Sequence, residues 1–363
     1  MSFVIERRDY TSIATMATAI VEDMIANGFN LLYPVSFTSG STKTAILQAN
    51  TEADPLFATE PWAIKISWEK DARNTAINET TTGGYLEVIV ATPTQFNLST
   101  GAHAIYAATA GTGDVNEAVG VLGTSLARTG SSTDYPDRIF IDRSKLTKTG
   151  DVDMTLAFPM SYHLTITARG IALFVWRQNV DDLGNKFSWF VVQRPVDNVT
   201  GVTVVTGKTP VHCLYNLMSI NENEPWTDEV NYKFNRFVVR EKDIVVPYPQ
   251  NRASTTRYGV DATIDTIDYA AVVNARQQVA ITENNKYVIS FPNGLNTSRY
   301  AYTYEMDMIA YTSADVVSKS SVVPITVYGE LTPRKYKAMM ANGPNNTGMR
   351  ILVLVEGGGI PAP

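Results

Sequence analysis

Cysteine and histidine are scarce in this sequence, whose 363 residues include one cysteine and three histidines. Cys213 has no second cysteine with which to form a disulfide or a thiolate metal cluster. In a strand, its neighbour His212 points to the opposite face, so the two do not form a nucleophile with its base. We therefore expect Cys213 to be a small strand residue in the protein interior.

Charge is scarce as well. Charged residues make up 18% of the chain, against about 25% in ordinary soluble domains, while the hydrophobic fraction of 44% is typical of a globular protein. The net charge of −6 provides no basic field to gather phosphates, which argues against specific binding of nucleic acid. A surface so poor in charge is covered by Thr, Ser, Asn and Gly, or it is hidden against partner proteins.

Long hydrophobic runs are missing too. No stretch approaches the roughly 20 apolar residues of a membrane-spanning helix, and the best candidate, residues 351–355, has the length of a strand. Residues 1–10 lack the apolar run of a secretory signal. We therefore expect a protein that is made in the cytoplasm and does not enter a membrane.

Motifs that carry chemistry are absent or incomplete. Five residues separate Gly201 from Gly207, where a phosphate-binding loop has four, and Pro210 stands where its helix would begin. His103, His163 and His212 have no zinc-ligand spacing, so we expect structural imidazoles with satisfied hydrogen bonds. The sequence thus predicts no catalytic, cofactor-binding or metal-binding residues, and a protein that is not an enzyme.

One alternative concerns sugars. Glu222 and Glu224 precede Trp226, and carboxylates beside an aromatic ring are the composition of a glycan site. The same residues are common in loops. A carbohydrate-binding or glycan-cleaving β protein therefore stays open as a second interpretation.

A helix is predicted near the start of the chain. Its apolar stripe follows helical spacing through Ile13, Met16, Ala17, Ile20, Val21, Met24 and Ile25. Asp9, Thr11 or Ser12 can cap its start, and Asn27-Gly28 can end it. The stripe packs either on the core of its own domain or on a neighbouring subunit.

The remaining pattern has the period of strands. We predict short strands within residues 62–68, 85–91, 171–178, 186–193, 202–205, 211–218, 232–239, 244–246, 272–281, 287–291, 325–331 and 349–355. This rhythm indicates a mainly β fold of sandwich-like or barrel-like domains with one N-terminal amphipathic helix. A segment rich in Gly, Ala, Ser and Thr at residues 100–135 divides a small domain, 1–140, from a larger antiparallel domain, 141–356.

Three further segments bear on partners. Tyr300, Tyr302 and Tyr304, continued by Met306 and Met308, line one face of a predicted strand and form either core or a subunit interface. The basic run at residues 334–337 is interpreted as a solvated face. Residues 357–363, which include Ile360 and Pro361, are predicted to form an exposed C-terminal arm.

In its order of features the chain resembles virion structural proteins of tailed bacteriophages. The likeness rests on the N-terminal helix, the β body rich in Thr, Asn and Gly, the scarcity of Cys and His, and the Gly/Pro-rich end. It implies a subunit of the tail, neck or baseplate, made in the host cytoplasm, that forms a homo-oligomer and joins other virion proteins in the virion. No cofactor is implied.

A major capsid protein fits less well, because no long backbone helix and no acidic spine helix are found. A decoration or cement protein on the capsid surface is an alternative. The residues we predict at subunit interfaces are Ile13, Met16, Ile20, Met24, Tyr300, Tyr302, Tyr304, Ile360 and Pro361.

Overall fold

The structure, a computed structural model, describes a large part of the chain. The described residues are 3–49, 56, 58–68, 85–103, 139–142, 160–177, 187–194, 196–197, 200–203, 211–216, 234–238, 277–281, 286–290, 293–296, 301–313, 317–318, 320–327, 330–342 and 349–357. The predicted fold class is confirmed: the protein is mainly β, with one N-terminal helix.

The N-terminal sheet has five strands in the order β2-β3-β4-β5-β8 and is antiparallel throughout. Its strands are β2 (Asn30–Tyr33), β3 (Thr44–Gln48), β4 (Ala63–Ser67), β5 (Tyr85–Ala91) and β8 (Ile139–Asp142). A 3₁₀ turn at Pro93–Gln95 leads from β5 into the small pair β6 (Phe96–Asn97) and β7 (Ala102–His103).

The central sheet has six strands in the order β1-β9-β10-β11-β13-β14, again all antiparallel. Its strands are β1 (Phe3–Tyr10), β9 (Met160–Thr167), β10 (Gly170–Arg177), β11 (Phe187–Gln193), β13 (His212–Asn216) and β14 (Phe234–Val238). The predicted hairpin of residues 171–178 and 186–193 is confirmed by the pairing of β10 with β11.

The C-terminal sheet has six strands in the order β15-β16-β19-β22-β21-β20. Its strands are β15 (Gln277–Ile281), β16 (Lys286–Ser290), β19 (Ile309–Ser313), β20 (Val322–Ile325), β21 (Arg334–Asn342) and β22 (Met349–Glu356). Its outermost strands β15 and β20 contact each other, so the sheet curls towards a barrel. A separate three-stranded sheet contains β12 (Val196–Asp197), β18 (Ala301–Glu305) and β17 (Asn293–Asn296).

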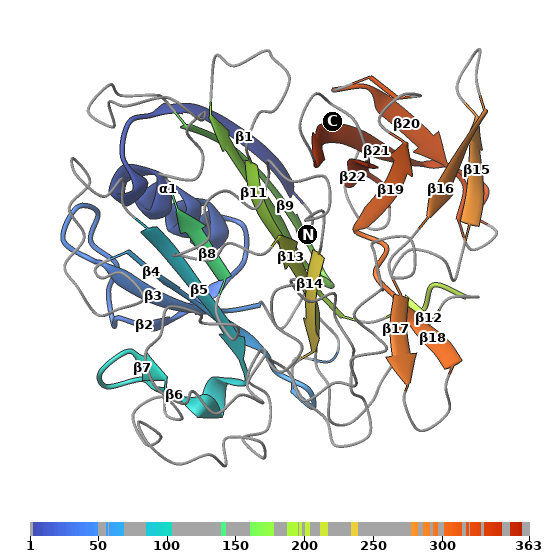
Figure 1. Ribbon diagram of the computed structural model, residues 1–363. Helices are drawn as coiled ribbons and strands as arrows, with labels where there is room; N and C mark the ends of the chain where they lie inside the picture. Colours follow the sequence, from blue (N-terminus) through green and yellow to red (C-terminus); the bar gives the residue numbers. More distant parts are fainter. Residues whose placement is uncertain are drawn as a thin grey trace, which may run out of the picture.

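The helix α1 (Ile13–Ala26) lies between the N-terminal and central sheets, and the C-terminal sheet covers the other face of the central sheet (Figure 1). Ser12 caps the helix by accepting the N–H of Thr15. At the other end the N–H groups of Gly28 and Phe29 reach the carbonyls of Ile25 and Met24, which is the Schellman motif. Gly28 adopts φ 102°, a conformation that suits glycine.

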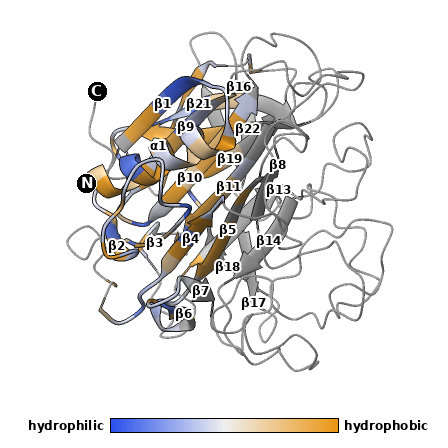
Figure 2. Ribbon diagram, turned by 90° about the vertical axis from the view of Figure 1, so that its left-hand side faces the viewer, coloured by the Kyte–Doolittle hydropathy of each residue, from blue (hydrophilic) through white to orange (hydrophobic). Residues whose placement is uncertain are grey.

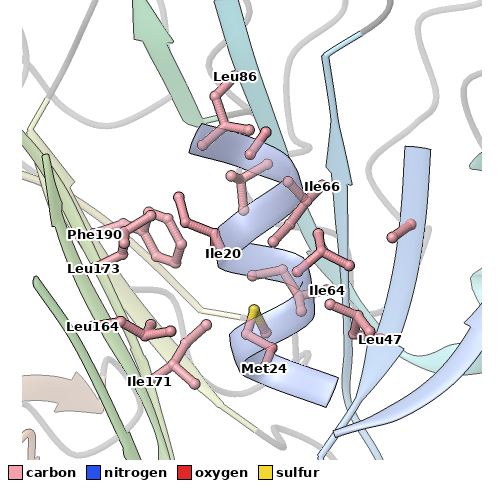
Figure 3. Packing of buried hydrophobic residues seen from close by; sticks show 14 of the residues in the cluster. Ile20, Met24, Leu47, Ile64, Ile66, Leu86, Leu164, Ile171, Leu173 and Phe190 are labelled. Carbon is pink, nitrogen blue, oxygen red and sulfur yellow. The ribbon is translucent and has the colours of Figure 1, made fainter. Parts of the chain in front are cut away.

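The main core surrounds α1 (Figure 3). Ile20 and Met24 of the helix meet Ile64 of the N-terminal sheet on one side and Leu164 of the central sheet on the other. The core therefore joins residues from both sides of the division that the sequence suggests at residue 140. Strand β1 crosses that division too, because it pairs with β9.

Several strands escape the sequence prediction, among them β2, β3, β8 and β19 as well as β1 and β21. The hydrophilic residues of β1, visible in Figure 2, hide its alternation, and β21 falls in the basic run that we interpret from sequence as a solvated face. Near β21, the strand predicted at residues 325–331 is wrong in position, since β20 ends at Ile325. The strands predicted at 85–91 and 349–355, and the pair within 272–281 and 287–291, are confirmed.

Candidate functional site

The most distinctive chemistry lies between the central and C-terminal sheets. We call it the polar seam and define it by Glu6, His163, Thr165, Thr167, Arg169, Gln193, Asp307, Glu330, Arg334, Tyr336 and Lys337. These side chains come from strands and turns that are far apart in the sequence. They meet because the two sheets pack face to face.

Strand β9 creates the seam through its alternation. Tyr162, Leu164 and Ile166 point into the core around α1, while His163 and Thr165 point to the opposite face. That second face is also buried: His163 and Thr165 are each 0% exposed. Because buried polar groups are costly without partners, each of them needs a hydrogen bond within the protein.

His163 has a partner at each ring nitrogen. Its Nδ1 lies 3.0 Å from Glu6 Oε1, and its Nε2 lies 2.9 Å from Thr165 Oγ1. The Thr165 hydroxyl also lies 3.2 Å from the carbonyl oxygen of Leu354 in β22. Lys337 of β21 donates to the same Glu6 oxygen. The expectation of a satisfied structural imidazole at His163 is therefore confirmed.

The protonation of this group follows from its contacts. The hydrogen bond from His163, aided by Lys337, lowers the pKa of Glu6 to about 2, so Glu6 is a carboxylate at neutral pH. Burial lowers the pKa of His163 and outweighs the opposite influence of Glu6. At neutral pH the ring is therefore uncharged, and its N–H donates to Glu6.

Asp307 is the centre of the second half of the seam. Its carboxylate accepts hydrogen bonds from Arg169 Nη2 at 2.7 Å, from Arg334 Nη1 at 2.5 Å and from Gln193 Nε2. Tyr336 donates to the backbone oxygen of Asp307 at 2.7 Å. Burial by itself raises the pKa of Asp307, but the two arginines together hold it below its ordinary value.

Tight local structure places these partners. Arg169 lies in the turn between β9 and β10, where the Thr167 hydroxyl accepts the N–H groups of Arg169 and Gly170. A Cβ atom at Gly170 would lie 2.0 Å from the carbonyl oxygen of Val192, so only glycine fits there. At the rim, Glu330 binds Arg334 through both carboxylate oxygens, at 2.8 and 2.6 Å.

A third polar group anchors β1 from the side of α1. Arg7 Nε donates to Asp23 Oδ2 at 2.7 Å, and the Tyr162 hydroxyl donates to the same oxygen at 2.5 Å. Tyr10 follows a bulge in β1 and stacks on Tyr162, with the ring centroids 5.6 Å apart. Glu6 and Arg7 thus fasten β1 on its two faces.

The order Thr165 hydroxyl, His163 imidazole and Glu6 carboxylate is that of a nucleophile with its base and orienting acid. The geometry nevertheless differs from a reactive site in one respect. Thr165 is fully buried, and its hydroxyl faces the Leu354 carbonyl, so a substrate has no route to it. The triad lies within the central sheet, and its contacts with the Leu354 carbonyl and with Lys337 join it to the C-terminal sheet.

The described residues include neither a candidate metal-binding cluster nor a candidate membrane-spanning helix. Within the ranges given above, no group of three or more His, Cys, Asp or Glu side chains is placed to hold a metal ion. In the part of the chain that the structure describes, no helix has the length and hydropathy needed to cross a membrane.

The residues predicted at interfaces fall into separate groups. Ile13, Met16, Ile20 and Met24 are 0–1% exposed in the core around α1, so these side chains have no surface left for a neighbouring subunit. Of the two alternatives for the helix stripe, the structure supports packing within the chain. This corrects the prediction that the four residues form a subunit interface.

The other predicted residues stay untested. Tyr302 and Tyr304 belong to β18, but their side chains are outside the description, as are Tyr300, Ile360 and Pro361. Met306 and Met308 do not continue that strand, because β18 ends at Glu305, and both are buried in the core between the central and C-terminal sheets. Glu222, Glu224 and Trp226 also lie outside the described residues, and so do the side chains of Cys213, His212 and His103.

Sequence reasoning missed the seam itself. Arg334 is 3% exposed, although its basic run was interpreted as a solvated face. Two signals are visible in retrospect: Arg334, Tyr336 and Ala338 alternate with lysines, and Asp307 stands between two methionines. Comparison with known proteins adds no functional assignment, since no protein-family model and no curated protein matches this chain.

Proposed function

We propose that the chain is a structural subunit of a tailed bacteriophage, built into the tail, neck or baseplate together with copies of itself. The observation that carries this proposal is that the buried polar groups of the seam are bonded to one another within the chain. Asp307 and His163, two ionisable residues of the seam that are 0% exposed, bond to other parts of the same chain. Such groups make a body that resists deformation, which is what a load-bearing subunit needs.

The composition supports the same proposal. Only 18% of the residues are charged, so much of the surface carries little repulsion between copies. We propose that the protein is not an enzyme and works by docking to neighbours in the virion. A decoration or cement protein would share these properties, and its position on the capsid would distinguish it.

The proposed contacts must exclude the helix stripe, which the core occupies. They comprise the tyrosines at 300, 302 and 304 and the C-terminal segment with Ile360 and Pro361. Gly357 marks where this segment leaves the described body: it adopts φ 84°, and a Cβ there would lie 3.0 Å from Arg334 Cγ. The segment to test therefore begins at residue 358.

The test combines light scattering with size-exclusion chromatography. The full chain should form a ring or another closed oligomer, and deletion of residues 358–363 should shift it towards the monomer while the urea midpoint stays unchanged. The double substitution I360S/P361G should act like the deletion, and the matched control A362S/P363G should not.

A different result would contradict the proposal. A chain that stays monomeric and cleaves polysaccharide, with cleavage lost in Glu222→Gln or Glu224→Gln, would establish the glycan-cleaving alternative instead.

A further inference from the structure

Strand β1 is the part of the fold that can separate most easily from the rest. It stands at the edge of the central sheet, and among the described strands it pairs with β9 alone. Val4 and residues 6–9 are exposed, so most of the outer surface of this strand faces solvent. A strand at the edge of a sheet and near the end of the chain, with little buried surface, opens at a low cost in free energy.

The position that β1 occupies beside β9 nevertheless requires a particular sequence. The buried carboxylate of Asp23 takes Arg7 as its cationic partner. The buried ring of His163 takes Glu6 as its anionic partner. Because buried charged and polar groups are costly without partners, the edge of β9 must be covered by a strand in which an acid is followed directly by an arginine. The first strand of this chain, in any copy, has that sequence.

The backbone of β1 is strained just after these two contacts. Between Arg7 and Tyr10, β1 has one residue more than β9 and forms a bulge. Within the bulge Asp9 adopts φ 69°, in the left-handed region that residues other than glycine seldom occupy. Residues 3–7 are thus joined to α1 through a strained position, and such hinges favour the exchange of an element between copies.

We propose that β1 exchanges between copies of this chain, so that residues 3–7 of one copy lie on β9 of a second copy in the register that they have within the chain. Recognition uses the contacts described above, Glu6 with His163 and Arg7 with Asp23. Exchange replaces each contact by an identical one between chains, and it lets the hinge adopt an extended backbone. The inference rests on the proposed assembly of copies and adds one contact to it.

The concentration of chains determines the extent of exchange. In dilute solution β9 is covered by the strand of its own chain, because the short connection to α1 keeps that strand close. In an assembly, neighbouring copies supply the same strand at a comparable local concentration. Exchange should therefore increase with protein concentration, and it should reverse slowly because β1 must leave β9 before it can return.

The first experiment detects the exchanged strand by disulfide formation. In chains that carry Cys213→Ser, one variant has Val4→Cys and another has Thr165→Cys, at two positions that face each other across β1 and β9. The variants are unfolded in urea, mixed, refolded at high concentration and oxidised. Exchange should give a covalent dimer of the two variants in electrophoresis without reductant. The control uses Val35→Cys, a fully exposed position just beyond β2, in place of Val4→Cys and should give at most a trace of dimer.

The hinge provides a second, independent test by size-exclusion chromatography with light scattering. Asp9→Gly accepts φ 69° without strain, so it should favour the chain with its own β1 in place and raise the dissociation constant of the oligomer by about fivefold or more. Asp9→Pro cannot adopt this φ and should shift the distribution towards the oligomer. The matched control is Ser320→Gly, at an exposed residue with φ 66° outside β1, which should leave the distribution unchanged.

The outcomes separate the exchange from the assembly itself. An oligomer without covalent dimers, while a single chain with both Val4→Cys and Thr165→Cys closes its own disulfide, would overturn the exchange and leave the structural role intact. A chain that is monomeric at every concentration would contradict both. If Thr165→Cys does not fold, the hinge variants decide, and equal distributions for wild type and Asp9→Gly would overturn the exchange.

Discussion

On the side of α1, strand β9 of the central sheet presents Tyr162, Leu164 and Ile166; on the side of the C-terminal sheet it presents His163 and Thr165. Both sides are buried, yet they are buried by different chemistry. The first side packs on the helix through carbon contacts. The second bonds to Glu6 of the neighbouring strand β1 and contacts the Leu354 carbonyl of the facing strand β22.

The two faces of β9 therefore make different contributions: apolar contacts stabilise the packing, and hydrogen bonds fix the relative position of the two sheets. Apolar contacts stabilise in proportion to the area they remove from water and accept small displacements. Hydrogen bonds to buried charges fail when the partners move by about 1 Å, so they fix how one sheet lies on the other. The α1 side supplies free energy, and the seam determines the relative position of the sheets.

The strongest way to break this comparison is to remove the acid at the centre of the seam. Asp307→Ala leaves Arg169 and the buried Arg334 without their shared carboxylate. We expect a loss of about 3–5 kcal/mol in the free energy of unfolding, measured in urea, because two arginines lose their shared buried carboxylate and Arg334 keeps only Glu330 as an acidic partner. Glu330→Gln, at the exposed rim, is the control and should cost less; similar losses in both would contradict a central role for Asp307.

A substitution in the core around α1 tests the apolar side of the comparison. Ile20→Ala removes a side chain that is 1% exposed, and we expect a loss of about 2–5 kcal/mol from the lost burial and the cavity. The loss should be the same at pH 7 and pH 5, unlike changes in the seam. Ile25→Ala, on the same helix but only partly buried, should cost less, and a pH-dependent effect of Ile20→Ala would blur the distinction.

The smallest change in the free energy of unfolding is expected at Lys335, which lies next to the seam in β21. Lys335 pairs with Glu356 at 2.7 Å, but the lysine side chain is 47% exposed. Lys335→Gln should change the free energy of unfolding by about 0.2–1 kcal/mol or less, because water screens the pair. A loss comparable to that of Asp307→Ala would show that burial does not separate the two kinds of ion pair. Urea unfolding in low and high salt provides the measurement.

The parts of the fold that follow local rules were predictable from the sequence. The stripe of α1, its stop at Asn27-Gly28 and the alternation of β4 all reflect spacing within a short segment. Alternation did not show that both faces of β4 are buried: Ala63 and Ser67 are buried too, and Ile46, Ile89 and Phe96 gather with Ala63 on the second face.

The seam was not predictable for the opposite reason. Glu6 and Lys337 are separated by 331 positions, and Arg169 and Asp307 by 138. No local spacing relates such residues, and a charged residue taken by itself is normally exposed. Only the packing of the sheets brings these partners together.

The pairing of β1 with β9, and of Glu6 with Lys337, also has a consequence for the order of folding. At about 5–20 residues per second, a ribosome needs on the order of tens of seconds to advance from residue 6 to residue 337. During the first half of that time β1 has no strand to pair with, because β9 is not yet made, and Glu6 lacks Lys337 for the whole of it. An apolar strand in this position would invite aggregation. Arg7, Arg8 and Asp9 give the waiting strand charge, which protects it until the strands that complete its environment have been synthesised.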